Sequence, residues 1–145
     1  MLFRSAASTS NSPVLDIFSV TVATIQSNSI SLPITIEIRE NETVETLGLI
    51  DIGAGGQFID QEYVEEMKLK TSLLEKPHLA RNVDGTKNKQ GKITSFVKLK
   101  LDINGKKIET RLLVTGLGKQ RIILGFPWLN EHNPEINWKT SEFKW

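Results

Sequence analysis

Short apolar strands separated by turn residues restrict the fold of this chain more than any other feature. Every second residue from Ile30 to Ile38 is Ile or Leu, and this alternation predicts a half-buried strand. Pro33 lies among the polar positions, and because proline cannot donate to a sheet ladder it indicates an edge or a strand start. After a turn at Arg39 to Asn41, Val44 to Asp51 is predicted to form the next strand.

The second half of the chain is also predicted to be β. The dipeptides Asp84-Gly85 and Asn104-Gly105 are typical of hairpin turns, and each lies between two apolar runs. The predicted strands of this half are, in order, His78–Val83, Ile93–Ile103, Ile108–Thr115, the buried run Arg121–Gly125, and a last hairpin of Ile136–Trp138 with Glu142–Trp145.

Two short helices interrupt this β pattern. Asp60 is a plausible N-cap for a helix over Gln61 to Leu69, which has apolar residues at helical spacing and acids in its first turn. Pro127 suits the first turn of a second helix that ends near Asn130. Many short strands with one or two short helices predict a mainly β fold, in the form of a small closed β-barrel.

The chain of 145 residues is 39% hydrophobic, which is enough for one globular domain with a core. Residues 1–29 are predicted to be a flexible leader or linker, because the first dozen residues are rich in Ser, Ala and Asn. Val14 to Thr24 within this leader has only a weak strand pattern. Residues 30–145 are predicted to form the domain.

The charge balance argues against a polyanionic partner. With 18 Lys and Arg against 17 Asp and Glu, the net charge is +1, so we expect neither nucleic acid nor a membrane surface as the main partner. The chain has no cysteine, and its two histidines lie far apart, so we expect no metal site and no cofactor.

No apolar run approaches the ~20 residues that a membrane-spanning helix needs. We therefore expect a soluble, cytoplasmic protein. The Arg and Ser content of the first eight residues, without an acid before Asp16, leaves a mitochondrial presequence as the alternative.

One carboxylate occupies a position suited to catalysis. The apolar residues Leu49 and Ile50 deliver Asp51 to a turn that contains Gly53. Acid proteases present a carboxylate in this way, and they pair two such groups about 3 Å apart so that one acts as base and the other as acid. The chain offers one loop of this form, so the pair requires two identical subunits. The alternative is that Asp51 only marks an ordinary turn at a strand end.

The motifs around Asp51 resemble those of a known family. The segment Leu49–Asp60 is similar to the active-site loop of retropepsin-like aspartic proteases, and most of all to those in the Pol polyproteins of Ty3/gypsy-type LTR retrotransposons. That family has the pattern Asp-Ser/Thr-Gly-Ala, then small residues and Phe-Ile. Further segments match in the same order, namely Arg81–Thr86 for the flap hairpin, Arg121–Gly125 for the strand behind the loop, Phe126–Pro134 for the helix after it, and Ile136–Trp138 near the end.

This resemblance covers residues 30–145 and implies a barrel of the retropepsin type. It implies that the domain is an endopeptidase that processes polyproteins, using water activated by an aspartate dyad across a homodimer. Asp51 would be the catalytic residue, and Ile52, Gly53 and Ala54 would complete its loop, with Gly53 allowing a tight turn. The flap over the peptide substrate would carry Val83, Asp84 and Gly85.

Two residues depart from the family pattern. The family has Ser or Thr at position 52, where the hydroxyl forms a hydrogen bond across the dimer axis, whereas this chain has Ile52. Isoleucine adds bulk and is expected to leave backbone groups without a partner, at about 1–3 kcal/mol each. Gly55 also replaces an expected hydroxyl residue. The alternative function is therefore a catalytically degenerate domain for dimerisation or peptide binding, and an unrelated β-barrel binding module is a further one.

Overall fold

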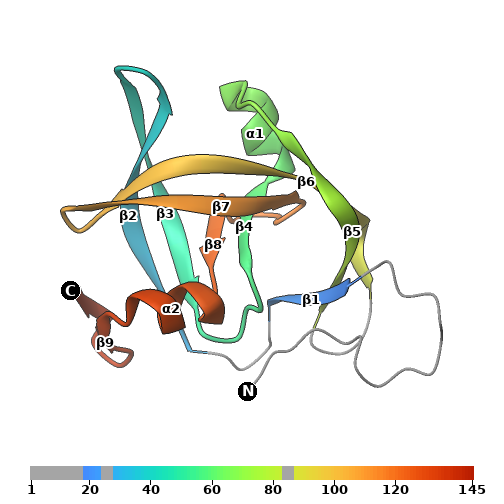
Figure 1. Cartoon of the computed structure of the whole chain (residues 1–145). Coiled ribbons are helices and arrows are strands. Elements are labelled where there is room, and N and C mark those ends of the chain that lie inside the picture. Colours follow the sequence, from blue (N-terminus) through green and yellow to red (C-terminus); the bar gives the residue numbers. More distant parts are fainter. Residues whose placement is uncertain (1–17, 24–27, 83–86) are drawn as a thin grey trace.

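The computed structural model describes residues 18–23, 28–82 and 87–145. Ten strands and two helices are defined over these ranges (Figure 1). The strands are β1 (Phe18–Ala23), β2 (Ser29–Arg39), β3 (Glu42–Asp51), β4 (Gln57–Asp60), β5 (Ser72–Asn82), β6 (Lys87–Ile103), β7 (Lys106–Thr115), β8 (Ile122–Leu124), β9 (Glu135–Asn137) and β10 (Glu142–Lys144). The helices are α1 (Gln61–Met67) and α2 (Phe126–His132).

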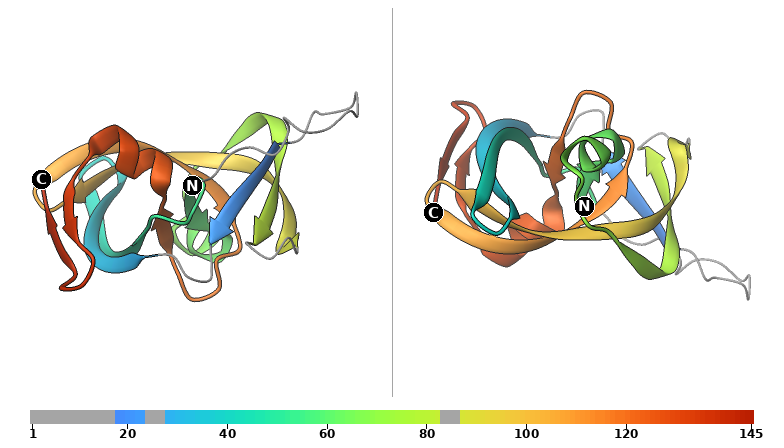
Figure 2. Two further views of the ribbon diagram at one scale, coloured as in Figure 1. Left: turned by 90° about the horizontal axis from the view of Figure 1, so that it is seen from below. Right: turned by 90° about the horizontal axis from the view of Figure 1, so that it is seen from above.

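Six strands close into a barrel. The sheet order is β1-β5-β6-β2-β3-β8-β4-β7, and β7 pairs with β6 as well as with β4, so the ring β6-β2-β3-β8-β4-β7 is complete. The two views of Figure 2 show how β6 and β7 wrap around the other strands. The predicted mainly β fold, with a closed barrel and two short helices, is confirmed.

The local sequence signals explain two features of this sheet. Pro33 pairs with Leu47 of β3, but β6 pairs only with Thr35 to Glu37 of β2, so the proline lies where β2 has one neighbour. The Asn104-Gly105 turn between β6 and β7 has positive φ at both residues, as a tight hairpin turn requires.

Two apolar clusters fill the molecule. The larger one occupies the barrel and includes the inward residues of β2, among them Ile34 and Ile36, together with Trp128 and Leu129 of α2. The smaller cluster joins β1 and β5 to β4, β6 and β8, and its buried members are Val22, Ala54, Phe58, Ala80, Ile93 and Ile123. Buried apolar area is the main source of stability in such a domain.

The helices differ in detail from the prediction. α1 begins after Asp60 as expected, but the Asp60 carboxylate makes no capping bond to the helix. Its Oδ1 instead accepts a hydrogen bond of 2.9 Å from the N–H of Leu117. α1 ends at Met67 because Lys68 adopts a left-handed conformation with φ of 55°. α2 has Pro127 in its first turn, as predicted, and continues to His132.

The sheet extends into the segment predicted as a leader. β1 lies within the weak Val14–Thr24 pattern and pairs in parallel with β5, with Val20 opposite Ala80. β5 itself begins at Ser72, six positions before the predicted His78, and its ladder with β6 is interrupted between Leu73 and His78. Within the described ranges, no helix is both long and apolar enough to cross a membrane.

Candidate active site

Asp51 ends β3 and begins a compact turn. Its side chain is only 3% exposed, and its Oδ1 accepts a hydrogen bond of 2.8 Å from the N–H of Gly53. The carbonyl oxygen of Asp51 accepts a second bond of 3.1 Å from the N–H of Ala54. The turn therefore fixes the carboxylate of Asp51 through one oxygen, while its other oxygen accepts no hydrogen bond from the described residues of the protomer.

Ile52 follows the carboxylate and points outward. Its side chain is 40% exposed, so it causes no overpacking within the protomer. Its N–H donates to the carbonyl oxygen of Asn28 at 3.1 Å, which joins the loop to the start of β2. The expectation that Ile52 leaves backbone groups unpaired is therefore wrong for its own amide N–H.

The strand and helix behind the loop hold it in place. Leu124 of β8 pairs with both β3 and β4, so β8 lies between the two strands that the loop connects. The start of α2 is bonded to the loop directly, because the N–H of Phe126 donates to the carbonyl oxygen of Ala54 at 2.8 Å. The role of core support expected for Ile122 to Leu124 fits this arrangement, since all three are buried.

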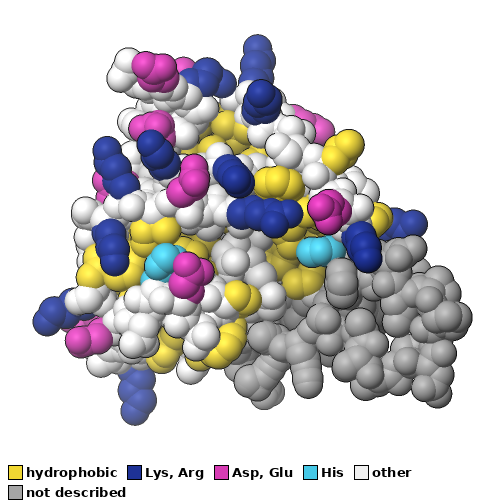
Figure 3. All heavy atoms as spheres, viewed as in Figure 1, with side chains coloured by type: hydrophobic (Ala, Val, Ile, Leu, Met, Phe, Trp, Pro, Cys, Tyr) yellow, Lys and Arg dark blue, Asp and Glu magenta, His cyan; other side chains and the backbone are white. Residues whose placement is uncertain are grey.

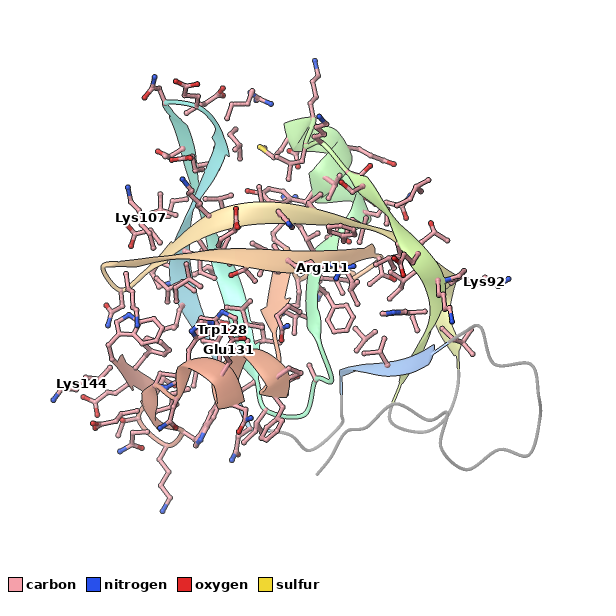
Figure 4. All side chains as sticks on the ribbon, in the orientation of Figure 1. Lys92, Lys107, Arg111, Trp128, Glu131 and Lys144 are labelled. Carbon is pink, nitrogen blue, oxygen red and sulfur yellow. The ribbon has the colours of Figure 1, made fainter. Side chains whose placement is uncertain are left out.

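A side chain strengthens the same junction. Oε1 of Gln57, just after the loop, accepts a hydrogen bond of 3.1 Å from the N–H of Trp128 in the first turn of α2. The indole of Trp128 is 3% exposed and packs in the barrel cluster, between α2 and the strands (Figure 4). The sequence pattern did not single out Gln57, because its role depends on a contact with a residue 71 positions later.

Gly125 is required where α2 meets the loop. A Cβ at this position would stand 2.4 Å from the carbonyl oxygens of both Ala54 and Gly56. We expect Gly125→Ala to lower the free energy of unfolding by about 1–3 kcal/mol, because backbone atoms must shift to make room. Denaturant unfolding measures this change. Gly56→Ala is the matched control, since its Cβ would meet only side-chain carbons at 3.2 Å or more, and an equal loss in both variants would contradict the argument.

Gly53 lies within the compact turn that follows Asp51. Its φ is not positive, so the turn does not require the conformational freedom of glycine within the protomer. What Gly53 contributes here is its N–H, which any residue other than proline would also supply.

The remaining predicted site residues are not described. Val83, Asp84 and Gly85 of the predicted flap lie outside the described residues, although β5 and β6 on either side of them are defined. Among the described residues, no ion pair involves Asp51, and no group of three or more potential ligands could hold a metal ion. The loop thus presents a buried carboxylate whose described partners are backbone groups.

Residues 47–145, from β3 to the end of the chain, match the family model described as the PEG10/RTL1 protease domain. The chain belongs to this family. The match contains the whole active-site loop, β8 and α2.

A solved structure supports the same fold. The retroviral protease-like domain of Ddi1 from Leishmania major is similar to this chain with a TM-score of 0.53, over 79% of this chain and 85% of that chain. The sequence identity is 20%, so this similarity concerns the fold alone. The predicted barrel of the retropepsin type is therefore confirmed as a fold.

Proposed function

We propose that this domain is an aspartic endopeptidase that hydrolyses peptide bonds with a dyad of Asp51 residues from two copies of the chain. The observation that carries the proposal is the buried Asp51 carboxylate, held by the N–H of Gly53 in a loop that β8 and α2 brace. Family membership supports the reaction class.

The chemistry follows from pairing two such carboxylates. Two carboxylates about 3 Å apart cannot both ionise, so they share one proton. The ionised Asp51 would take a proton from a water molecule as that water attacks the scissile carbonyl carbon. The protonated Asp51 of the second copy would donate to the carbonyl oxygen, which gives a tetrahedral diol. When the C–N bond breaks, the first Asp51 would pass its proton to the leaving nitrogen and the second would take a proton from a diol hydroxyl, so that the dyad returns to its starting state. No cofactor takes part in this mechanism.

The proposed partner is a second copy of the chain. An isologous dimer would bring the two loops together at its axis. Ile52, a large apolar residue exposed next to the buried carboxylate, would then be covered by the partner protomer.

The proposed substrate is a peptide segment of a polyprotein of the Ty3/gypsy retrotransposon type, processed in the cytoplasm, with the mitochondrion as the alternative location. On the face drawn in Figure 3, Lys and Arg are mixed with Asp and Glu and form no continuous basic surface, which favours a peptide over nucleic acid as the ligand. A polypeptide can add to a sheet through its backbone whatever its charge.

Ile52 also favours a second candidate, a degenerate domain that dimerises or binds peptides without cleaving them. An isoleucine cannot supply the hydroxyl that the family pattern has at this position. This candidate makes the same dimer and differs only in the rate of hydrolysis.

A proteolysis assay distinguishes the two candidates. The full chain is incubated at about pH 4–6, where a carboxylate dyad holds one proton, with a denatured protein as the substrate. We expect cleavage that pepstatin inhibits, and sedimentation that shows a dimer. A folded dimer that cleaves nothing would support the degenerate domain, and cleavage that persists in pepstatin would point to a contaminating protease.

A further inference from the structure

β1 lies between the active-site loop and β5 (Figures 1 and 2). It stands at the end of the sheet order, and its one partner there is β5, which it joins in parallel. Five residues after β1 ends, the carbonyl oxygen of Asn28 accepts the N–H of Ile52. β1 is therefore paired with β5, the strand that leads to the predicted flap. Asn28, five residues after β1, is bonded to the active-site loop.

Two valines of β1 pack onto an apolar surface. Val22 is 4% exposed and belongs to the smaller apolar cluster, and the partly buried Val20 packs against that cluster. Cγ2 of Val20 lies 3.4 Å from the place where a Cβ at Gly56 would stand, so β1 reaches the loop itself. We call the other buried members of this cluster the β1-covered surface, which consists of Ala54, Phe58, Ala80, Ile93 and Ile123.

The β1-covered surface borders the carboxylate. Ala54 belongs to the loop, and its N–H donates to the carbonyl oxygen of Asp51. Leu49, which packs against the same cluster, is two residues before Asp51 in β3, and residues two apart lie on one face of a strand. Asp51 therefore faces the side of the sheet on which β1 is bound.

We propose that the β1-covered surface is the peptide-binding surface of this protease domain, and that β1 occupies it in cis. The inference rests on the proposed function. An extended peptide would add to the edge of β5 as β1 does, and would place β-branched aliphatic side chains at alternate positions where Val20 and Val22 lie. The preferred ligand class is thus an extended peptide with Val or Ile at every second residue.

Occupation in cis makes β1 a competitor of any peptide in trans. A segment tethered by a short linker has an effective concentration in the mM range. A free peptide must therefore displace β1 before it binds. Weakening the contacts of β1 is expected to strengthen peptide binding, which is the opposite of what loss of a purely structural strand would do.

The test measures binding in the full chain with Asp51→Asn, so that cleavage does not interfere. The probe is a fluorescein-labelled peptide with the sequence of residues 18–23, Phe-Ser-Val-Thr-Val-Ala, and the readout is fluorescence anisotropy. We expect the additional changes Val20→Lys and Val22→Lys to tighten binding by about tenfold or more, because the tethered competitor is removed.

Two controls accompany this measurement. Thr21→Lys adds one of the two positive charges to β1 but keeps both valines, and should bind the probe no better than the parent. A probe with Lys at both Val positions should bind poorly to every variant. Because the Lys pair can unfold the chain, thermal unfolding is measured for each variant. If the Lys pair is unfolded, the binding measurement is made instead on the milder pair Val20→Ala with Val22→Ala.

The outcomes separate this proposal from the proposed function. Folded variants that bind the probe no better than the parent, or that bind the Lys probe equally well, would overturn the assignment of the surface. Tighter binding of the valine probe, together with an absence of cleavage in a folded Val20→Lys, Val22→Lys chain that keeps Asp51, would support the surface and reject the endopeptidase.

Discussion

Asp51→Asn is expected to reduce peptide cleavage by about 10²–10⁴-fold, because an amide can neither accept a proton from water nor share one with a partner carboxylate. The fold should survive, since Oδ1 of asparagine can accept the N–H of Gly53 as the carboxylate does now. The measurement is the rate of cleavage of a denatured protein at about pH 4–6. Thermal unfolding of the variant confirms that the loss is chemical.

Asp60→Asn is the matched control for this result. Asp60 is also a buried carboxylate, and its Oδ1 likewise accepts one backbone N–H, from Leu117. It is the last residue of β4, nine positions after Asp51 and beyond the turn that carries Asp51, so this variant should keep its cleavage activity. Equal losses in the two variants would show that the effect of Asp51→Asn is structural.

Mixing experiments test the dyad itself. If each site needs one Asp51 from each of two copies, excess Asp51→Asn protein should lower the activity per wild-type chain, because mixed dimers carry one carboxylate. If excess Asp51→Asn protein leaves the activity per wild-type chain unchanged while both proteins are dimeric, the proposal of a dyad across the dimer axis is wrong.

Periodicity predicted the strands that have one buried face. β2 alternates over its whole length, with Ile34 and Ile36 in the barrel, and the Asn104-Gly105 turn fixed the hairpin of β6 and β7. β4 was not predicted as a strand, because it is short and three of its four residues are buried, which leaves no alternation to detect.

Other features of the site depend on contacts between distant parts of the chain. The early start of β5 lacked a signal because Pro77 and an interrupted ladder follow it. The pairing of β1 with β5 joins segments about 60 positions apart, as Phe18 and His78 show, and a weak local pattern cannot specify such a register. Asp51 was found because the loop motif is local, whereas Gln57 and Asn28 act through partners that only the folded chain brings near.

Ile52→Thr is expected to raise the rate of cleavage by about tenfold. Threonine would place one hydroxyl from each protomer at the dimer axis, and two new hydrogen bonds at about 0.5–1.5 kcal/mol each reach the 1.4 kcal/mol that corresponds to a factor of ten. The change should cost the protomer little, because the side chain at position 52 is 40% exposed. The measurements are kcat/KM and the dimer dissociation constant from sedimentation.

Ile52→Val distinguishes the hydroxyl from the reduced bulk, because valine has the shape of threonine without the oxygen. If threonine increases activity and valine does not, the missing hydroxyl limits this dyad, and Ile52 has weakened a site that Asp51 and its braced loop still maintain. If both variants gain equally, steric bulk at the axis is the cause. If neither variant cleaves although each forms a dimer, the loop no longer supports hydrolysis, and peptide binding is the function that the fold retains.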